Sequence, residues 1–211
     1  MSDADIPVQV FLLDDENAVT DGVMWLLESV RIPSRSFDQA ERFKQALREA
    51  KTPVCAVLDL RMPGTSGLEL QQQLIEEGLD VPLIFLSAHG DVPAAVLAMQ
   101  QGAVDFLQKP FNSQAFLNSI NRIVRLARER FVRRQVDQGV RSLLLRLSAR
   151  ELEVLDGLLE GKTSKHLARD LGISPKTIDV HRASVMRKLA VTSGAELVRL
   201  VGAARALVKA E

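Results

Sequence analysis

The sequence of 211 residues has a single cysteine, no tyrosine and no long apolar run. One cysteine cannot form an intramolecular disulfide, a pattern typical of proteins that fold in a reducing compartment. Cys55 stands in the apolar segment 54–58, where we expect it to pack in the core. The first five residues are acidic where a secretory signal would be basic, and no apolar stretch approaches the ~20 residues of a membrane span. We therefore expect a soluble, cytoplasmic protein that does not bind membranes.

The formal net charge is zero, but the two signs of charge are segregated along the chain. Residues 1–118 hold 8 basic and 17 acidic side chains, a balance of −9, whereas residues 119–211 hold 19 basic and 10 acidic ones, a balance of +9. Such a division indicates two modules with different partners, of which the basic one could bind a polyanion. Residues 119–146 alone carry 8 basic and 2 acidic side chains, which leaves only +3 for residues 147–211. Charge is therefore weak evidence for DNA binding.

Short apolar segments alternate with helical patterns through the first 110 residues. Segments 8–13, 54–58 and 83–86 favour buried strands. Between them the apolar residues recur at helical spacing: Phe43, Ala46, Leu47 and Ala50, and then Leu68, Leu70, Leu74 and Ile75. This alternation predicts βαβ units in a mainly parallel sheet. Functional groups of such a sheet gather at the carboxyl ends of its strands.

Five polar side chains follow successive strands of the predicted sheet: Asp14, Asp15, Asp59, Ser87 and Lys109. Clustered carboxylates repel one another and need a cation, and an oxygen-only site open to water suits Mg²⁺. A hydroxyl and an ammonium are the groups that hold the oxygens of a phosphoryl group, so we expect attack of a carboxylate on phosphorus. A single aspartate at a strand end is usually a loop or capping residue, but this ordered set is a much rarer coincidence.

A long helix is predicted from residue 113 to about residue 146. Its apolar residues recur at helical spacing: Phe116, Ile120, Ile123, Val124 and Ala127. Gly139 is the one strong breaker in this stretch, and we expect a break near it. The arginine-rich face of the helix fits a solvated linker better than a surface that contacts DNA, which stays the alternative.

The chain after residue 147 carries strong helix-boundary signals. Ser148 and Glu151 fit a capping box, and Gly161 and Gly172 fit helix ends. Either Thr163 or Ser164 caps the helix between the two glycines, and Ser174 with Pro175 begins the next one. Residues 164–189 are therefore predicted to form a helix, a tight turn and a second helix.

The helix predicted at 175–189 has an apolar stripe and an opposite polar face. Ile178, Val185 and Leu189 share the stripe and should pack on Leu155, Leu167 and Leu171. On the other face, the candidates for reading base edges in a major groove are Asp179, Val180, Ala183 and Arg187. The candidates for phosphate contacts are Lys165, Lys176, Thr177, Arg182 and Lys188. Each could instead be a solvated side chain, although phosphate contact is favoured for Lys176 and Lys188.

Residues 7–125 resemble a response-regulator receiver domain. The resemblance rests on Leu13-Asp-Asp-Glu16, Leu58-Asp-Leu-Arg-Met-Pro-Gly64, Leu86-Ser-Ala88 and Phe106-Leu-Gln-Lys-Pro110. It implies a flavodoxin-like (CheY-like), doubly wound α/β fold with strand order 2-1-3-4-5.

The same resemblance implies roles for individual residues. Asp59 would be the phosphoacceptor, with Ser87 and Lys109 binding the phosphoryl group and Phe106 in the aromatic switch position. Mg²⁺ would be held by Asp15, Asp59 and the Arg61 carbonyl, with Asp14 acting through water. A cis bond between Lys109 and Pro110 is also implied. His89 lies two positions after Ser87, where it would either tune dephosphorylation or be a plain loop residue.

Residues 147–205 resemble the LuxR-type helix-turn-helix domain of the FixJ/NarL response regulators. The matching blocks are residues 147–155, 173–181 and 187–189. The resemblance implies a four-helix, all-α DNA-binding domain at 147–211, joined by a helical linker at 126–146. Ser164 and His166 depart from the asparagine and glutamate that are frequent in the family, which puts in doubt the phosphates that are contacted but not the fold.

The sequence thus predicts a phosphorylation-activated transcription regulator of a two-component system rather than an enzyme with turnover. Its expected partners are a sensor histidine kinase, promoter DNA, RNA polymerase and, when phosphorylated, a second copy of the chain. Phosphorylation should draw Ser87 inward, Phe106 should follow, and the fourth helix and fifth strand should then form a dimer surface. Two alternatives are a metal-dependent phosphatase and a degenerate receiver that serves only as a protein-interaction module.

Overall fold

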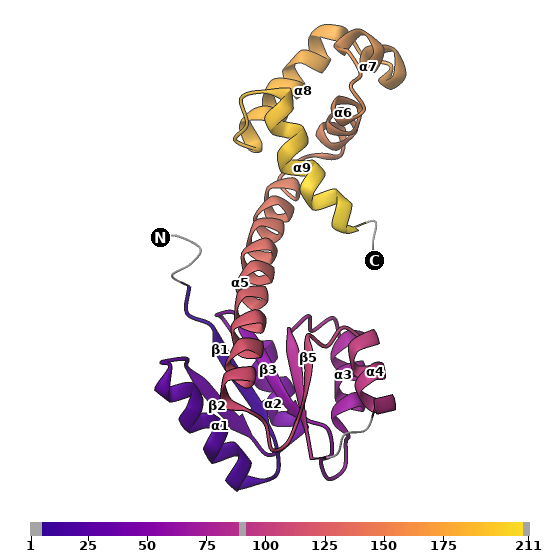
Figure 1. Cartoon of the computed structure of the whole chain (residues 1–211). Coiled ribbons are helices and arrows are strands. Elements are labelled where there is room, and N and C mark those ends of the chain that lie inside the picture. The colour runs from indigo at the N-terminus through magenta and orange to yellow at the C-terminus, as the bar shows by residue number, and fades with distance from the viewer. Residues whose placement is uncertain (1–5, 89–91, 209–211) are drawn as a thin grey trace. The chain divides into compact units, whose positions relative to one another are not determined.

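The computed structural model describes residues 6–88 and 92–208, with side chains described through residue 202. The chain divides into two compact units, Met1–Val132 (the first unit) and Arg133–Glu211 (the second unit) (Figure 1). His89 lies outside the described residues. Within the described ranges, no helix is long and apolar enough to cross a membrane.

The first unit is built on a parallel sheet of five strands in the order β2-β1-β3-β4-β5. The strands are β1 (Gln9–Leu13), β2 (Ser34–Phe37), β3 (Val54–Asp59), β4 (Leu83–Ser87) and β5 (Asp105–Gln108). Leu13 at the end of β1 is in register with Leu58 of β3, and Asp59 is in register with Leu86 of β4. The carboxyl ends of the three central strands therefore lie side by side, as the sequence predicted.

Helices cover both faces of this sheet (Figure 1). One face packs against α2 (Ala40–Glu49), α3 (Gly67–Glu76) and α4 (Val92–Gln100). The other packs against α1 (Asn17–Ser29) and the first part of α5 (Ser113–Leu144). Each face has its own buried core, which is the layered arrangement expected of a doubly wound α/β fold.

Glycine at position 67 brings α3 close to the functional end of β3. A Cβ atom there would lie 2.3 Å from the Asp59 carbonyl oxygen and 2.9 Å from the Phe85 ring. Only glycine permits so close an approach of the helix start to the backbone of Asp59. Ser66, just before it, caps α3 and forms a capping box with Glu69.

The long helix α5 continues without a break through Gly139, where the sequence predicted one. A glycine in a helix interior costs only about 1 kcal/mol relative to alanine, and the residues on both sides remain helical. Its neighbour Val140 is 3% exposed, so burial favours the helical path at this position. The predicted break was therefore wrong.

The second unit is all-helical and follows the boundaries predicted from its caps. Its helices after α5 are α6 (Ala149–Leu159), α7 (Ser164–Leu171), α8 (Pro175–Lys188) and α9 (Gly194–Val208). The Ser148–Glu151 capping box is present, Thr163 caps α7, Gly172 ends it at φ 67°, and Ser174 with Pro175 begins α8. The apolar stripe of α8 is buried in the cores that contain Leu155 and Leu167. The predicted combination of an α/β and an all-α domain is confirmed.

Candidate functional site

The ends of β1 and β3 and the residue after β5 form an acidic pocket in the first unit. Lys109 Nζ lies 2.8 Å from Asp14 Oδ2 and 2.7 Å from Asp59 Oδ1. The side chain of Asp14 is fully buried, and those of Asp59 and Lys109 are only 9% and 11% exposed. The structure therefore brings together three of the groups that the sequence placed at strand ends, although Lys109 is 50 residues from Asp59.

Backbone amides hold both buried carboxylates of this pocket in place. The Glu16 N–H donates to Asp14 Oδ1 at 2.9 Å, and the Arg61 N–H donates to Asp59 Oδ2 at 2.8 Å. Each carboxylate thus uses one oxygen for a loop amide and the other for Lys109. This arrangement fixes the orientation of Asp59 before any reaction, which reduces the entropy lost on reaching a reactive geometry.

Lys109 keeps its positive charge in the pocket. Burial opposes that charge, but hydrogen bonds and ion pairs with Asp14 and Asp59 outweigh burial, so the pKa of Lys109 is raised above its ordinary value. One ammonium faces two buried carboxylates, with Asp15 exposed nearby. The pocket therefore carries an excess of negative charge that a cation would balance.

The remaining predicted residues of the pocket lie on β4, β5 and the loop after β3. Ser87 is 1% exposed at the end of β4, and its carbonyl accepts from the Lys109 N–H at 2.7 Å. Phe106 is half-buried on β5, with its ring 6.2 Å from that of Phe85. The Lys109–Pro110 peptide bond is cis, as the resemblance implied.

The donor atoms expected in the pocket suit Mg²⁺ better than a metal whose ligands are all protein side chains. No three carboxylate, imidazole or thiol side chains of the described ranges converge on one metal position. The donors that the receiver resemblance implies, Asp15, Asp59 and the Arg61 carbonyl, are all oxygens. Mg²⁺ prefers oxygen and is usually bound through one or two carboxylates while it keeps several waters.

The outer face of α8 exposes most of the side chains that the sequence assigned to DNA. Val180 is 64% exposed. The other exposed candidates of this group are Lys165, Lys176, Thr177, Asp179, Arg182, Ala183 and Arg187. Asp179 accepts a hydrogen bond from the Ser164 hydroxyl at 2.8 Å, which ties the start of α7 to α8. The start of α7 and α8 thus expose charged and polar side chains together with Val180 and Ala183.

Lys188 is placed differently from the other basic candidates. Its Nζ lies 2.6 Å from Glu151 Oε2 and donates to the Arg146 carbonyl at 3.2 Å. Glu151 also accepts from the Ser184 hydroxyl at 2.7 Å. Sequence reasoning identified Glu151 only as a capping residue, because no local pattern connects it to a lysine 37 positions away.

A cavity of about 670 Å³ lies beside α8 in the second unit. Lys165, Arg182 and the first residues of α7 stand at its wall, and Leu158, Met186 and Leu197 supply apolar surface. Basic side chains beside the N-terminus of a helix form an environment that favours phosphate oxygens. The cavity thus adds a geometric argument for the two basic candidates that line it.

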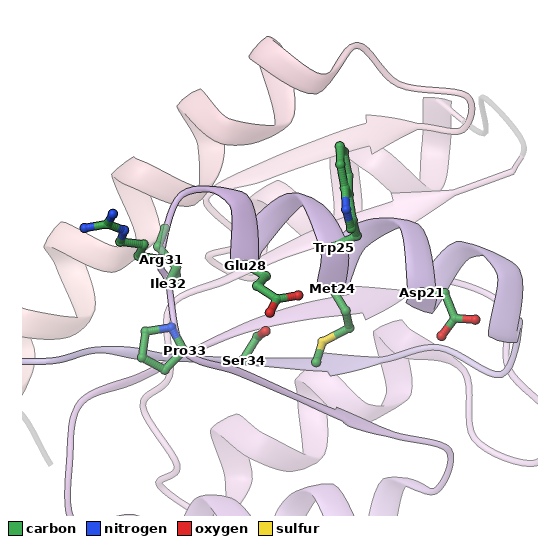
Figure 2. Close-up of a pocket in the computed structure, with 8 residues that line it drawn as sticks. All are labelled: Asp21, Met24, Trp25, Glu28, Arg31, Ile32, Pro33 and Ser34. Atoms are coloured by element: carbon green, nitrogen blue, oxygen red, sulfur yellow. The ribbon is translucent and has the colours of Figure 1, made fainter.

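A second cavity, of about 700 Å³, lies between the end of α1 and the start of β2. Figure 2 shows that Trp25 points to the opposite side of α1 from Met24, Glu28 and Asp21. Trp25 is 71% exposed and is the only tryptophan of the chain. The side chains that line this second cavity do not converge on one point, so we assign no chemistry to the cavity.

Two family models match the chain. Residues 10–121 match the response regulator receiver domain, and residues 145–201 match the luxR family of bacterial regulatory proteins. The matches coincide with the acidic pocket and with the helix-turn-helix face, respectively.

Similar full-length proteins cover both regions. The transcriptional regulatory protein TdiR of Thauera aromatica is 43% identical over 192 residues, which span 91% of this chain and 84% of that protein. The transcriptional regulatory protein FixJ of Bradyrhizobium diazoefficiens is 39% identical over 191 residues, spanning 90% and 93%. A solved structure of the response regulator StyR matches with a TM-score of 0.80 at 41% identity, covering 93% of this chain and 98% of that one.

Proposed function

The chain belongs to the response regulators that join a receiver domain to a LuxR-type DNA-binding domain, and we propose that Asp59 is the residue that switches it. It is a DNA-binding transcription regulator of a two-component system. The observation that carries the proposal is the buried contact of Asp59 with Lys109 at 2.7 Å, beside Asp14. Because the family consists of transcription factors rather than classical enzymes, the phosphatase alternative is set aside.

The proposed reaction transfers a phosphoryl group to Asp59 from a phosphohistidine of a sensor kinase. A carboxylate oxygen of Asp59 forms a bond to phosphorus, the nitrogen–phosphorus bond breaks, and the imidazole leaves. Ser87 and Lys109 bind the oxygens of the transferred group. Receiver domains usually use Mg²⁺, which supplies charge neutralisation when bound. Asp15, Asp59 and the Arg61 carbonyl would hold it here, and Asp14 would act through water.

The proposed response to phosphorylation is a population shift toward a dimer. Movement of Ser87 toward the new phosphoryl oxygens leaves space that Phe106 fills, which alters the surface of α4 and β5. That surface already has apolar character: α4 exposes the large apolar side chains of Val92, Val96, Leu97 and Met99. Exposed large apolar side chains on one helix are typical of an interaction surface.

DNA contacts are proposed for the exposed face of α8 and the start of α7. Val180 and Ala183 suit thymine methyl groups, and Asp179 suits the amino group of cytosine. Arg187 completes the proposed base-reading set. Lys165, Lys176, Thr177 and Arg182 are the proposed phosphate contacts, whereas Lys188, the fifth candidate from the sequence, is proposed to contribute little because it is paired with Glu151. RNA polymerase is a further proposed partner, since the family regulates transcription.

The proposed domain boundaries are 7–125 for the receiver, 126–146 for the linker and 147–211 for the DNA-binding domain. The receiver match ends at residue 121, and the luxR match begins at residue 145. The boundary between the two compact units falls between Val132 and Arg133, within α5. All three observations support a helical connection in this interval. A cytoplasmic location is proposed because the DNA-binding domain must reach the chromosome.

The test compares the chain with Asp59→Asn in the presence of beryllofluoride and Mg²⁺, which mimic a phosphorylated aspartate. Wild-type protein should dimerise in analytical ultracentrifugation and enrich a two-fold symmetric site from a random DNA library. The Asp59→Asn variant should stay monomeric and enrich no such site, whereas Asp38→Asn, an exposed aspartate outside the pocket, should behave as wild type. A full-strength dimer of Asp59→Asn would overturn the proposal. Failure of the wild type to bind the mimic would favour the interaction-module alternative.

A further inference from the structure

The first residue of α7 contacts α8 through its side chain. The hydroxyl of Ser164 donates to Asp179 Oδ1 at 2.8 Å, although the two residues are 15 positions apart in the chain. The cap of α7 is the preceding residue, Thr163, whose hydroxyl accepts from the His166 N–H. The Ser164 hydroxyl is therefore not needed to cap the helix, and its contact in the structure is with a side chain of the proposed base-reading set.

The carboxylate of Asp179 has one oxygen engaged and one oxygen open. Among the side chains that the structure describes, Ser164 is its one hydrogen-bond donor, and Asp179 forms no ion pair with any of them. Asp179 is exposed on the outer face of α8, as are Val180 and Ala183. An ionised carboxylate only accepts hydrogen bonds, so Asp179 Oδ2 is available to a donor outside the protein.

Two basic side chains of α8 compete with Ser164 for this carboxylate. Lys176 and Arg182 lie three positions before and three positions after Asp179, the spacing at which opposite charges on one helix pair. In the described part of the chain Asp179 pairs with neither of them and is held by the neutral hydroxyl instead. The contact with Ser164 therefore leaves both cations available for phosphates and keeps the carboxylate out of an ion pair along the helix surface.

We propose that Ser164 is a positioning residue for base recognition: it holds Asp179 Oδ1, so that Oδ2 accepts from a base in the major groove. The inference rests on the proposed role of Asp179 in DNA binding. The amino group of cytosine offers a donor in the major groove, and a single carboxylate oxygen is enough to accept from it. Fixing the side chain beforehand reduces the entropy that is lost when this contact forms. Ser164 thus determines specificity without contacting DNA itself.

Selection from a random DNA library, with the full chain, beryllofluoride and Mg²⁺, tests the proposal position by position. The wild type should favour cytosine by roughly ten-fold at one position of each half-site, and Asp179→Ala should lose that preference. Ser164→Ala should reduce the same preference to about three-fold or less, because a hydrogen bond that positions the carboxylate is lost, and should keep the other positions. Ser164→Thr retains a hydroxyl and should restore the preference. Ser142→Ala, at an exposed serine of α5, is the control and should select the wild-type site.

A double variant separates positioning from an independent contact with DNA. If Ser164 acts through Asp179, the combination of Ser164→Ala with Asp179→Ala should show the base preferences of Asp179→Ala alone. A uniform loss of affinity for all sequences in Ser164→Ala would make Ser164 a phosphate contact and overturn the proposal. Unchanged preferences in Ser164→Ala, beside a loss in Asp179→Ala, would refute the role of Ser164 and leave the proposed function intact. Unchanged preferences in Asp179→Ala would refute base reading by Asp179, and the role of Ser164 with it.

Discussion

At the scale of single residues, buried carboxylates serve two different purposes in this chain. Asp59 is held by one lysine and one backbone amide, and Asp15, which follows Asp14, is exposed. Glu151 is 5% exposed and is bound by Lys188, the Ser184 hydroxyl and the Ser148 N–H. Asp59 is proposed to react, whereas Glu151, saturated by three donors, contributes to stability. Burial also makes the Cys55 thiol unreactive, because it raises the pKa of the thiol to about 12 and so disfavours the thiolate.

Glu151 should make the stability of the second unit depend on acid pH. Hydrogen bonds from Lys188, from the Ser148 amide and from Ser184 lower its pKa from 4.5 to about 2. Because the folded-state pKa is depressed, the stabilisation is complete above about pH 4.5 and is lost as pH falls through about 2. We expect Glu151→Gln to lower the free energy of unfolding by roughly 1–3 kcal/mol at about pH 7, and by much less near pH 2.

Urea unfolding followed by circular dichroism over that pH range measures the effect. Glu153→Gln is the matched control, because Glu153 is exposed and forms a surface ion pair with Arg150 one turn away. Glu153→Gln should lower the free energy of unfolding by less than about 0.5 kcal/mol at every pH. A difference between Glu151→Gln and wild type that does not change with pH would show that the charge of Glu151 does not stabilise the fold.

At the scale of elements, two glycines inside helices have opposite environments. A Cβ atom at Gly157 of α6 would lie 2.1 Å from Leu167 Cδ2, and Leu167 is 2% exposed in the core. A Cβ atom at Gly139 of α5 would meet nothing within 4 Å. Gly139→Ala should therefore stabilise the chain by up to ~1 kcal/mol through helix propensity. Gly157→Ala should destabilise it by about 1–3 kcal/mol, because the gain in propensity is outweighed by overpacking.

Thermal unfolding of the two alanine variants provides the comparison. Both variants replace a glycine inside a helix with alanine. Opposite signs of the change in stability would therefore isolate the contact with Leu167. If both variants gained stability, Leu167 would have to move at little cost, and the close packing of α6 on α7 would not require glycine.

The sequence predicted elements well wherever a local signal marks their ends. The caps at Ser148, Thr163, Gly172 and Ser174 all stand where the boundary residues indicated. β2 (Ser34–Phe37) was not identified from its own residues, because only Phe37 is buried and the polar segment lacks a strand pattern. α4 was expected only from the receiver resemblance and not from its own residues, because apolar residues on its exposed face hide the helical periodicity.

The part of the candidate site that depends on strand topology could be predicted from the sequence. Parallel strands in adjacent positions bring Asp14 and Asp59 together, so their convergence with Lys109 could be predicted. The ion pair of Lys188 with Glu151 could not, because it depends on the packing of α8 against the start of α6. Their positions on the predicted helix made Lys188 look equivalent to Lys176, and only the structure, in which Lys176 is exposed and Lys188 is half-buried, separates them.

At the scale of the whole molecule, the exposed apolar face of α4 should control assembly. We expect Val96→Glu, at a position 49% exposed, to prevent the dimer that beryllofluoride and Mg²⁺ induce, because a buried unpaired carboxylate at an interface costs several kcal/mol. The monomer should keep its stability, since the side chain is on the surface. Val30→Glu, at a position 42% exposed on the opposite face of the sheet, is the control. Sedimentation of the three proteins checks this, and a dimer in Val96→Glu would move the interface elsewhere.

The salt dependence of DNA affinity reports how many phosphates the protein contacts, and it therefore also depends on whether the protein binds as a dimer. Each phosphate contact adds about 0.9 to the slope of log K against log salt concentration on duplex DNA. A symmetric dimer presents each side chain twice, so Arg182→Ala, an exposed residue at the cavity beside α8, should reduce the slope by about 2 with the phosphorylation mimic present. Lys188→Ala should change the slope much less and lower stability instead, because Lys188 is paired with Glu151. Fluorescence anisotropy on a selected site at several salt concentrations measures both slopes, with urea unfolding run in parallel. A large loss of slope in Lys188→Ala at unchanged stability would mean that Lys188 leaves Glu151 for a phosphate when DNA binds.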